Sequence, residues 1–485
     1  MSDLSESARP GRTVPAKDVR HDALSADDLV GLTGGHLIRD SLRPIRSAAV
    51  DSRLVRPGEL FVALPGERTD GHRFLREAVM AGAAALIVTA EPDFATLAVL
   101  GDVTIISVVD PMAALQAVAS GWRARFEPLV VGVTGSIAKT STKEAIASVL
   151  TTHGRTLSTE GNQNNEIGLP LTLLRLDSEA VNVVLEMGMY AGGEIARLAE
   201  LARPEIGVVT AILGVHLSRI GSIEAVENAK AELVEALPAH GVAVLNADDP
   251  RVRGLHARTP ARVVTYGFAA DADVGADQVR SAGIAGMRFR LRYPGQGGIE
   301  SVAASIPALG RLSVHNALAA SAVGMAAGMR VDEIVSALAG GWSAPHRGQL
   351  VIAGGVTIVD DSYTASPASM AAALDLLAGL PGRRIAVLGG MRELGDESEA
   401  GHLRTGALAA AVCALLVTVG SEATDIARGA RDAGLAPDAI LEVLDRAEAL
   451  TKLTTILRPR DVVLVKASRG AALDRLVEAL QLALA

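Results

Sequence analysis

A lysine and a threonine follow a run of small residues in segment 132–141, Gly-Val-Thr-Gly-Ser-Ile-Ala-Lys-Thr-Ser. Glycines let a loop backbone approach a ligand, and the free N–H groups of a following helix attract an anion. In such a loop the lysine reaches the terminal phosphates of a nucleotide and the threonine hydroxyl binds Mg²⁺. The alternative is an ordinary strand-to-helix turn with a solvated lysine. We predict a nucleotide site formed by Gly132, Gly135, Ser136, Ala138, Lys139, Thr140 and Ser141.

One position departs from the usual phosphate-binding loop. Glycine normally precedes the lysine, and here the residue is Ala138. A Cβ at this position either occupies space where the backbone meets the phosphates or forces a strained dihedral angle.

Further polar residues follow apolar runs that are typical of buried strands. Glu186 ends the run 181–185, His216 follows the run 206–211, and Lys230 lies in the helix predicted after it. The carboxyl ends of parallel strands meet at one edge of a sheet, where such sheets bind ligands. Glu186 is thus a candidate for Mg²⁺ binding, with a cap or a salt bridge as the alternative. A single histidine is more often structural, and a helical lysine is usually solvated.

Strands and helices alternate along the chain, which predicts an α/β protein with largely parallel sheets. Its 485 residues suggest three domains. We expect a small N-terminal α/β domain over residues 25–126, a central phosphate-loop domain with a parallel sheet over 127–344, and a doubly wound, Rossmann-like domain over 345–485. The last lacks the Gly-x-Gly-x-x-Gly pattern, which argues against a bound dinucleotide.

The composition excludes several classes of function. A net charge of −9 and 2% aromatic residues provide neither a basic face nor stacking platforms for nucleic acid. No apolar run reaches the length of about 18 residues that a membrane span needs. The first twenty residues are polar, unlike a secretory signal, and the single cysteine, Cys413, fits a reducing compartment. We expect a cytoplasmic monomer.

Several motifs resemble those of the Mur ligase family and follow one another along the chain in the family's order. The general family resemblance lies in 134–140, Glu186-Met187-Gly188, His216 and 229–232. More specific matches are Asp51-Ser52-Arg53 with Asp70-Gly71-His72, 161–170, Asp360-Asp361-Ser362-Tyr363, Leu394-Gly395 and 465–470. Together they extend over nearly the whole chain from about residue 44.

The resemblance implies an ATP-dependent ligase that activates a carboxylate as an acyl phosphate and joins it to an amine. Within the family, the motifs most resemble the members that add D-alanyl-D-alanine to a UDP-N-acetylmuramoyl-tripeptide. The resemblance also implies two Mg²⁺ sites and a UDP-sugar site in the N-terminal domain. Such catalysis depends mainly on positioning and on neutralising phosphate charge.

The resemblance further implies roles for individual residues. Lys139, His216 and Lys230 would be catalytic, with Lys230 carbamylated by CO₂. The metal ligands would be Thr140, Glu186, His216 and Lys230. The nucleotide would also contact Asn316, Asp361 and Tyr363. The substrates would contact Ser52, Arg53, Asp70, His72, Asn162, Asn164, Asn165, Glu166, Lys466, Ser468 and Arg469.

The chain departs from the family pattern at several positions besides Ala138. A histidine is replaced by Leu312, an arginine expected after Gly348 by Gln349, and an aspartate by Gly390. Thr364, Ser366, Ala467 and Ser218 are further departures. They leave open a paralogous ligase with another amine or carboxylate substrate, and an inactive nucleotide-binding scaffold. The scaffold is disfavoured because four residues that such a protein could lose are all present: Lys139, Glu186, His216 and Lys230. The third residue of the peptide, lysine or diaminopimelate, stays open.

Overall fold

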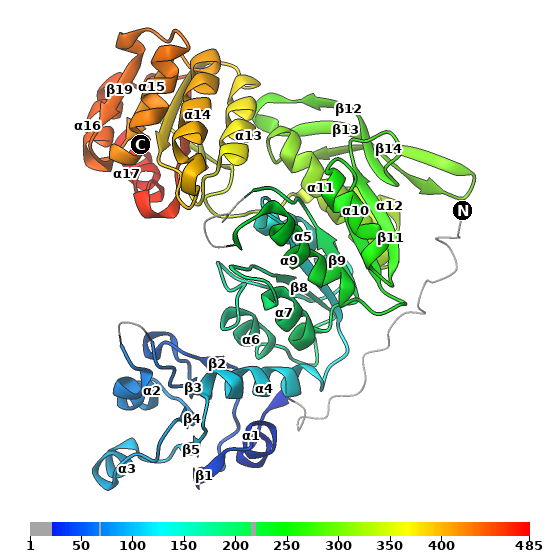
Figure 1. The fold of residues 1–485 in the computed structure, drawn as a ribbon, viewed down its shortest axis with the longest axis vertical. Coiled ribbons are helices and arrows are strands. Elements are labelled where there is room, and N and C mark those ends of the chain that lie inside the picture. The colour runs from blue at the N-terminus through cyan, green and yellow to red at the C-terminus, as the bar shows by residue number, and fades with distance from the viewer. Residues whose placement is uncertain (1–21, 67–68, 215–219) are drawn as a thin grey trace.

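The computed structural model describes residues 22–66, 69–214 and 220–485, which form three sheets arranged along the molecule (Figure 1). This is the α/β architecture expected from the sequence. Among the described residues, no helix is long and apolar enough to cross a membrane.

The N-terminal sheet has five strands in the order β1-β5-β4-β3-β2, all parallel except β1. Its strands are β1 (His36–Arg39), β2 (Ala48–Ala49), β3 (Leu60–Val62), β4 (Ala85–Val88) and β5 (Thr104–Ser107). Its helices are α1 (Ala26–Thr33), α2 (Leu75–Met80), α3 (Phe94–Leu100) and α4 (Pro111–Arg123), with short 3₁₀ turns η2 (Ser52–Leu54) and η3 (Gly71–Phe74). Every residue of β3 and β4 is buried, as apolar runs in a covered parallel sheet require.

The middle sheet has nine strands in the order β14-β13-β12-β11-β10-β9-β6-β8-β7. The strands are β6 (Leu129–Thr134), β7 (Thr156–Ser158), β8 (Asn182–Glu186), β9 (Ile206–Val209), β10 (Val242–Asn246), β11 (Arg262–Gly267), β12 (Val274–Ser281), β13 (Met287–Gly295) and β14 (Gly298–Ile306). The first seven run parallel, and β12 to β14 form antiparallel hairpins. The central strands β6, β8 and β9 end at one edge, where the phosphate loop begins.

The helices of the middle part cover this sheet. They are α5 (Lys139–Thr151), α6 (Gly168–Leu173), α7 (Glu194–Ala202), α9 (Ile223–Glu235), α10 (Pro250–Gly254), α11 (Gly310–Ala326) and α12 (Val331–Gly340), with η4 (Leu255–Arg258) and η5 (Gly283–Ala285). Helix α11 begins at Gly310, five residues before His315, so Asn316 lies in its second turn.

The C-terminal sheet has six strands in the order β15-β16-β20-β17-β18-β19. They are β15 (Gln349–Ala353), β16 (Val356–Asp361), β17 (Arg383–Gly389), β18 (Leu415–Val419), β19 (Ile440–Val443) and β20 (Asp461–Lys466). The helical elements are α13 (Pro367–Ala378), α14 (Ser398–Val412), α15 (Thr424–Asp432), α16 (Arg446–Ile456) and α17 (Asp474–Leu484), with η6 (Gly395–Glu397), η7 (Ser421–Ala423), η8 (Pro437–Ala439) and η9 (Arg469–Ala471). Separate apolar clusters on the two faces make this sheet doubly wound.

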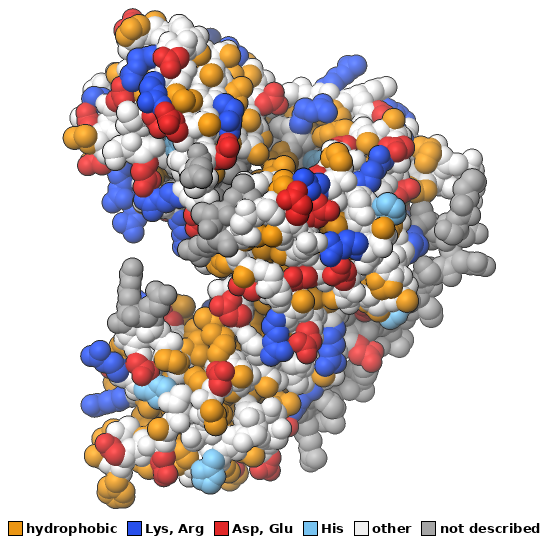
Figure 2. All heavy atoms as spheres, in the orientation of Figure 1, with side chains coloured by type: hydrophobic (Ala, Val, Ile, Leu, Met, Phe, Trp, Pro, Cys, Tyr) orange, Lys and Arg blue, Asp and Glu red, His pale blue; other side chains and the backbone are white. Residues whose placement is uncertain are grey.

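The two junctions between the three parts differ in chemistry. One apolar cluster continues from the N-terminal sheet through α4 into the middle sheet, and includes Leu60, Leu115 and Val183. The indole N–H of Trp122 donates to the carbonyl of Leu176 across this junction, at 3.0 Å. The junction between the middle and C-terminal parts instead contains a cavity that charged, polar and apolar side chains line together. Figure 2 shows a wide opening between the N-terminal and C-terminal lobes, with Lys and Arg side chains gathered on the C-terminal side of it.

Candidate functional site

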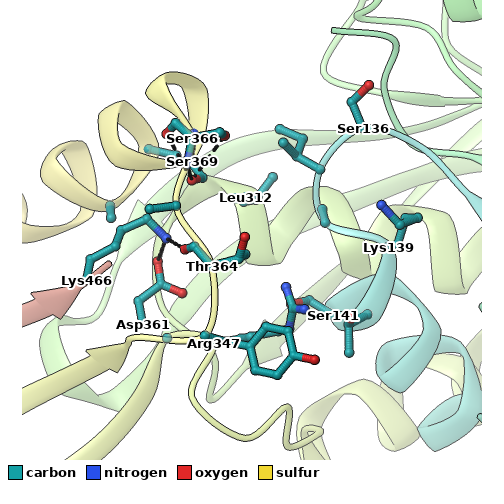
Figure 3. A pocket seen from close by; sticks show the side chains of 18 of the residues that line it. Ser136, Lys139, Ser141, Leu312, Arg347, Asp361, Thr364, Ser366, Ser369 and Lys466 are labelled. Carbon is teal, nitrogen blue, oxygen red and sulfur yellow. Dashed lines mark hydrogen bonds and ion pairs between the residues drawn. The ribbon is translucent and has the colours of Figure 1, made fainter. Parts of the chain in front are cut away.

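A cavity of about 600 Å³ lies between the middle and C-terminal sheets. It is lined by the phosphate loop, the start of α11, the linker at Arg347 and Gly348, and the loops that follow β16, β17 and β20. In Figure 3, Lys139 lies across this space from Asp361, Thr364 and Lys466. Thirteen of the predicted site residues contribute to its wall: Ser136, Ala138, Lys139, Thr140, Ser141, Asn164, Glu186, Asn316, Asp361, Tyr363, Lys466, Ser468 and Arg469.

The phosphate loop is anchored to the end of β9. The hydroxyl of Thr210 donates to the carbonyl of Ile137 at 2.6 Å, and the N–H of Ser136 donates to the carbonyl of Ala211 at 2.8 Å. Gly135 has φ 150°, and a Cβ there would lie 1.9 Å from the Thr210 hydroxyl oxygen. Only glycine fits this position. Gly132 lies within β6, where a Cβ would meet Leu233, so its small size serves helix packing.

Ala138 adopts a left-handed conformation, with φ 62° and ψ 2°, immediately before α5. This is the strained dihedral angle that the sequence analysis gave as one consequence of replacing glycine. An L-residue in this region is disfavoured by about 1–2 kcal/mol, because its Cβ crowds the following carbonyl oxygen. The loop therefore keeps a glycine-like path despite the methyl group.

Lys139 begins α5 with its ammonium folded back over the loop. Its Nζ donates to the carbonyl oxygen of Gly135 at 2.8 Å. Desolvation lowers the pKa of Lys139, the Glu186 carboxylate raises it, and the Arg347 guanidinium lowers it further. Two cations from different parts of the chain thus face the same cavity, which favours a polyanionic ligand.

Glu186 is buried at the end of β8, and each of its carboxylate oxygens has a partner. The Thr140 hydroxyl donates to Oε2 at 2.6 Å, and the Asn164 amide donates to Oε1 at 2.8 Å. Hydroxyl, carboxylate and amide oxygens are the ligand types that Mg²⁺ prefers. The donor set of Thr140 and Glu186 therefore fits a magnesium ion.

Lys230 lies on α9 and is buried. Burial lowers its pKa well below that of a free lysine, and the nearby Lys139 ammonium lowers it further. His216, the other predicted ligand of a second metal ion, lies outside the described residues. The charges of Lys230 and Lys139 therefore interact. The predicted role of His216 stays a prediction.

The amide-rich turn before α6 divides into one cavity residue and three others. The Asn164 amide donates to Glu186, whereas the Asn165 side-chain oxygen accepts the N–H groups of Ile167 and Gly168 where α6 begins. Asn162, Asn165 and Glu166 do not contribute to the cavity wall. Their predicted substrate contacts stay predictions.

Asn316 is buried, and the Thr142 hydroxyl of α5 donates to its side-chain oxygen at 3.0 Å. The preceding residue, His315, lies 3.0 Å from the Asn246 side-chain oxygen and 3.3 Å from Asp248, both at the end of β10. Contacts to α5 and to the end of β10 therefore fix the second turn of α11 beside the phosphate-loop helix.

The C-terminal wall is built around an ion pair and an aromatic ring. The Lys466 ammonium is buried, lies 2.6 Å from Asp361 and also donates to the carbonyl of Thr364. Tyr363 has the Arg347 guanidinium 4.2 Å and the Arg469 guanidinium 5.5 Å from its ring centre. Both distances allow cation–π attraction.

Arg347 was not among the predicted site residues; the sequence showed only that Gln349 replaces the arginine that follows Gly348 in the family pattern. The cavity receives the guanidinium from the residue before that glycine, while Gln349 begins β15. The available signal was the run His346-Arg347-Gly348 between two predicted domains, since linkers frequently enter interdomain sites. Ser468 is held by a backbone contact, because its hydroxyl accepts the N–H of Arg392 at 3.0 Å.

The four predicted residues of the N-terminal part lie outside the central cavity. Asp51 caps η2, which contains Ser52, and also pairs with Arg53 at 2.6 Å. His72 accepts the Thr89 N–H at Nε2, so its Nδ1 carries the proton donated to Asp70 at 2.6 Å. The His72 backbone N–H also lowers the pKa of Asp70. These contacts order two loops at the ends of neighbouring strands.

Family models match most of the chain. Residues 44–123 match the Mur ligase family catalytic domain, 133–324 the Mur ligase middle domain, and 346–469 the Mur ligase glutamate ligase domain. The UDP-N-acetylmuramoyl-tripeptide--D-alanyl-D-alanine ligase of Escherichia coli K12 is 37% identical over 444 residues, which cover 90% of this chain and 93% of the relative. The enzyme of the same name from Bacillus subtilis 168 is 35% identical, with coverage of 90% and 93%.

Solved structures agree with these relationships. MurF from Acinetobacter baumannii superposes with a TM-score of 0.84 at 28% identity, covering 95% of this chain and 99% of that one. MurF ligase from Thermotoga maritima, in complex with ADP, gives a TM-score of 0.78 at 28% identity, with coverage of 92% and 99%. The chain belongs to the Mur ligase family.

Proposed function

We propose that this protein is the ATP-dependent ligase that joins D-alanyl-D-alanine to a UDP-N-acetylmuramoyl-tripeptide in peptidoglycan precursor synthesis. The observation that carries the proposal is one cavity that the phosphate loop, Glu186 and the basic residues of the C-terminal loops, such as Lys466 and Arg469, line together. Relatives of that name match about 90% of both chains. Such a reaction takes place in the cytoplasm, where ATP is available.

The chemistry requires activation of a carboxylate, because an oxide ion is a poor leaving group. The terminal phosphoryl group of ATP passes to the tripeptide carboxylate and forms an acyl phosphate and ADP. The amine of D-alanyl-D-alanine then attacks the acyl carbon, and phosphate leaves as the amide forms. Lys139 and Arg347 are placed to neutralise the transferred charge. Asn316, Asp361 and Tyr363 hold the nucleotide from two sides.

Two Mg²⁺ ions would neutralise phosphate and carboxylate oxygens. Thr140 and Glu186 would hold one, and His216 and Lys230 would contribute to the second. An uncharged lysine amine adds CO₂ and loses a proton, which gives a carbamate with anionic oxygens. The lowered pKa of Lys230 supports this modification, since it populates the uncharged amine.

The substrates approach from opposite sides of the cavity. The UDP end of the tripeptide is assigned to the N-terminal domain, through Ser52, Arg53, Asp70 and His72. Asn162, Asn164, Asn165 and Glu166 are assigned to the substrate near the metal site. Lys466, Ser468 and Arg469 are assigned to the peptide and the incoming dipeptide. The gathering of basic side chains at the opening suits anionic substrates (Figure 2). We divide the chain into domains at 25–126, 127–344 and 345–485.

A substrate panel tests this function. UDP-muramoyl peptides ending in lysine or diaminopimelate are crossed with amino acids and dipeptides, and ADP formation is measured. We expect sustained ADP formation, over many turnovers, only when a tripeptide and D-alanyl-D-alanine are both present, and none from Lys139→Ala. If ADP forms with a different amine and not with D-alanyl-D-alanine, the chain is a paralogous ligase. The absence of ADP with every pair would identify a scaffold.

A further inference from the structure

Lys143 is a buried cation close to the site that the proposed reaction does not use. It lies four residues after Lys139 on α5, and its side chain is 1% exposed. Its Nζ is 2.5 Å from the Thr159 carbonyl oxygen and 2.5 Å from Glu144 Oε1. A buried ammonium is strongly disfavoured unless charged and polar partners surround it. Its position therefore demands an explanation in terms of what it holds.

The carbonyl that Lys143 contacts belongs to Thr159, which also contacts the backbone of Glu186. Thr159 directly follows β7 and is itself buried. Its hydroxyl oxygen accepts the backbone N–H of Glu186 at 3.1 Å, and its own N–H donates to the Val184 carbonyl at 3.1 Å. Thr159 thus connects the ammonium on α5 with the end of β8.

The same segment also provides the second partner of the carboxylate. Five residues beyond Thr159, the side-chain amide of Asn164 donates to Glu186 Oε1 at 2.8 Å. The backbone carbonyl of Asn164 accepts the Gly188 N–H at 2.8 Å. The opposite oxygen, Oε2, accepts the Thr140 hydroxyl from α5 itself. Segment 159–164 and α5 therefore contact Glu186 from two sides. Lys143 links that segment to α5 through the Thr159 carbonyl.

We propose that Lys143 is a positioning residue for Glu186. Its ammonium ties segment 159–164 to the phosphate-loop helix, so that both carboxylate oxygens keep the orientation needed to hold a divalent cation. The inference rests on the proposed function, in which Glu186 binds Mg²⁺. It assigns Lys143 no contact with nucleotide or substrate.

The test measures metal binding without turnover. Mn²⁺ replaces Mg²⁺, and its binding to the enzyme–ADP complex is followed by electron paramagnetic resonance. ADP binding without metal is measured separately. We expect Lys143→Met to weaken Mn²⁺ binding at least tenfold while metal-free ADP binding changes less than twofold. Lys452→Met, which removes a partly exposed lysine paired with Glu448 on α16, is the matched control and should change neither.

A second pair of variants keeps the inference testable if Lys143→Met does not fold. Thr159→Val preserves the carbonyl that Lys143 contacts and removes only the hydroxyl that accepts the Glu186 N–H. Thr159→Ser retains that hydroxyl. We expect Thr159→Val to weaken Mn²⁺ binding severalfold and Thr159→Ser to bind as the parent does. Equal Mn²⁺ binding by Thr159→Val and Thr159→Ser would overturn the inference, as would unchanged binding in a folded Lys143→Met.

Glu186→Gln separates this failure from failure of the proposed function. If Glu186→Gln loses Mn²⁺ while the Lys143 and Thr159 variants keep it, only the role of Lys143 is wrong. If Glu186→Gln binds Mn²⁺ as the parent does, the proposed metal site is wrong and the inference is overturned with it.

Discussion

The guanidinium of Arg347 lies 4.2 Å from the ring centre of Tyr363, and this contact joins the interdomain linker to the C-terminal sheet inside the cavity. A backbone bond reinforces it, because the Tyr363 N–H donates to the His346 carbonyl at 3.1 Å. Arg347 also lowers the pKa of Lys139. The stacked pair therefore carries a cation from the linker toward the phosphate loop.

Removing the ring should misplace that cation. Cation–π attraction contributes about 0.5–2 kcal/mol, depending on exposure. We expect Tyr363→Leu to raise the KM for ATP and to lower kcat, so that kcat/KM falls about tenfold. Tyr363→Phe should retain most activity, because the aromatic face remains. Steady-state kinetics with varied ATP check this. Equal losses in both variants would show that the hydroxyl, and not the ring, matters.

The role of Lys139 predicts complete loss of catalysis without loss of structure. Lys139→Ala removes the cation at the start of α5 while its helix keeps its packing, so the melting temperature should change little. ADP formation with both substrates should fall below detection. Circular dichroism and calorimetry provide the control for folding. Retained turnover would refute the assignment of the phosphate loop.

Relief of strain at Ala138 should be measurable. Glycine adopts φ 62° freely, which recovers about 1–2 kcal/mol of strain, and its greater freedom in the unfolded chain offsets about 0.4–1 kcal/mol. We expect Ala138→Gly to have equal or slightly higher thermal stability and equal or higher turnover. Ala138→Val should be destabilised, because a β-branched residue tolerates this region poorly. A large loss of turnover in Ala138→Gly would mean that the methyl group itself shapes the site.

The carbamate assigned to Lys230 predicts a dependence on CO₂ and on pH. Burial lowers the pKa of Lys230, so its uncharged amine is available at a lower pH than that of a free lysine. As the pH falls through this lowered pKa, the amine becomes protonated and no longer adds CO₂. In CO₂-depleted buffer, bicarbonate should therefore restore activity above that pKa and not below it.

Labelling and chemical rescue check the same assignment. With ¹³C-labelled bicarbonate, the carbamate carbon should give a resonance that is absent from Lys230→Ala. That variant should be inactive and partly rescued by short carboxylates, which supply the missing oxygens. Absence of the labelled signal in the parent protein would contradict the carbamate.

The sequence predicted the site best where local pattern and chemistry coincide. The apolar, β-branched run before the phosphate loop forms β6, and Glu186 ends β8 beside it, because parallel strands bring their carboxyl ends to one edge. The strain at Ala138 followed from its Cβ alone. These inferences needed only short-range rules and one rule of sheet topology.

Other features depend on packing that a local pattern does not contain. Strand β15 is an antiparallel edge strand whose pairing with β16 has no counterpart in the expected βα alternation. Arg347 enters the cavity because a linker with His346 at φ 58° and Gly348 at φ 73° turns it inward. Thr142 and Lys143 resemble ordinary helix residues until their partners, Asn316 and Thr159, are known.

The shared apolar core at α4 has a mechanical consequence. Sliding or hinging there would expose apolar side chains to water, so the first two sheets should move together as one rigid unit. The second junction contains the cavity, and the linker residues Arg347 and Gly348 line its wall. Motion during the catalytic cycle is therefore expected to be a swing of the third lobe alone, which delivers the incoming amine to a partner already held in place.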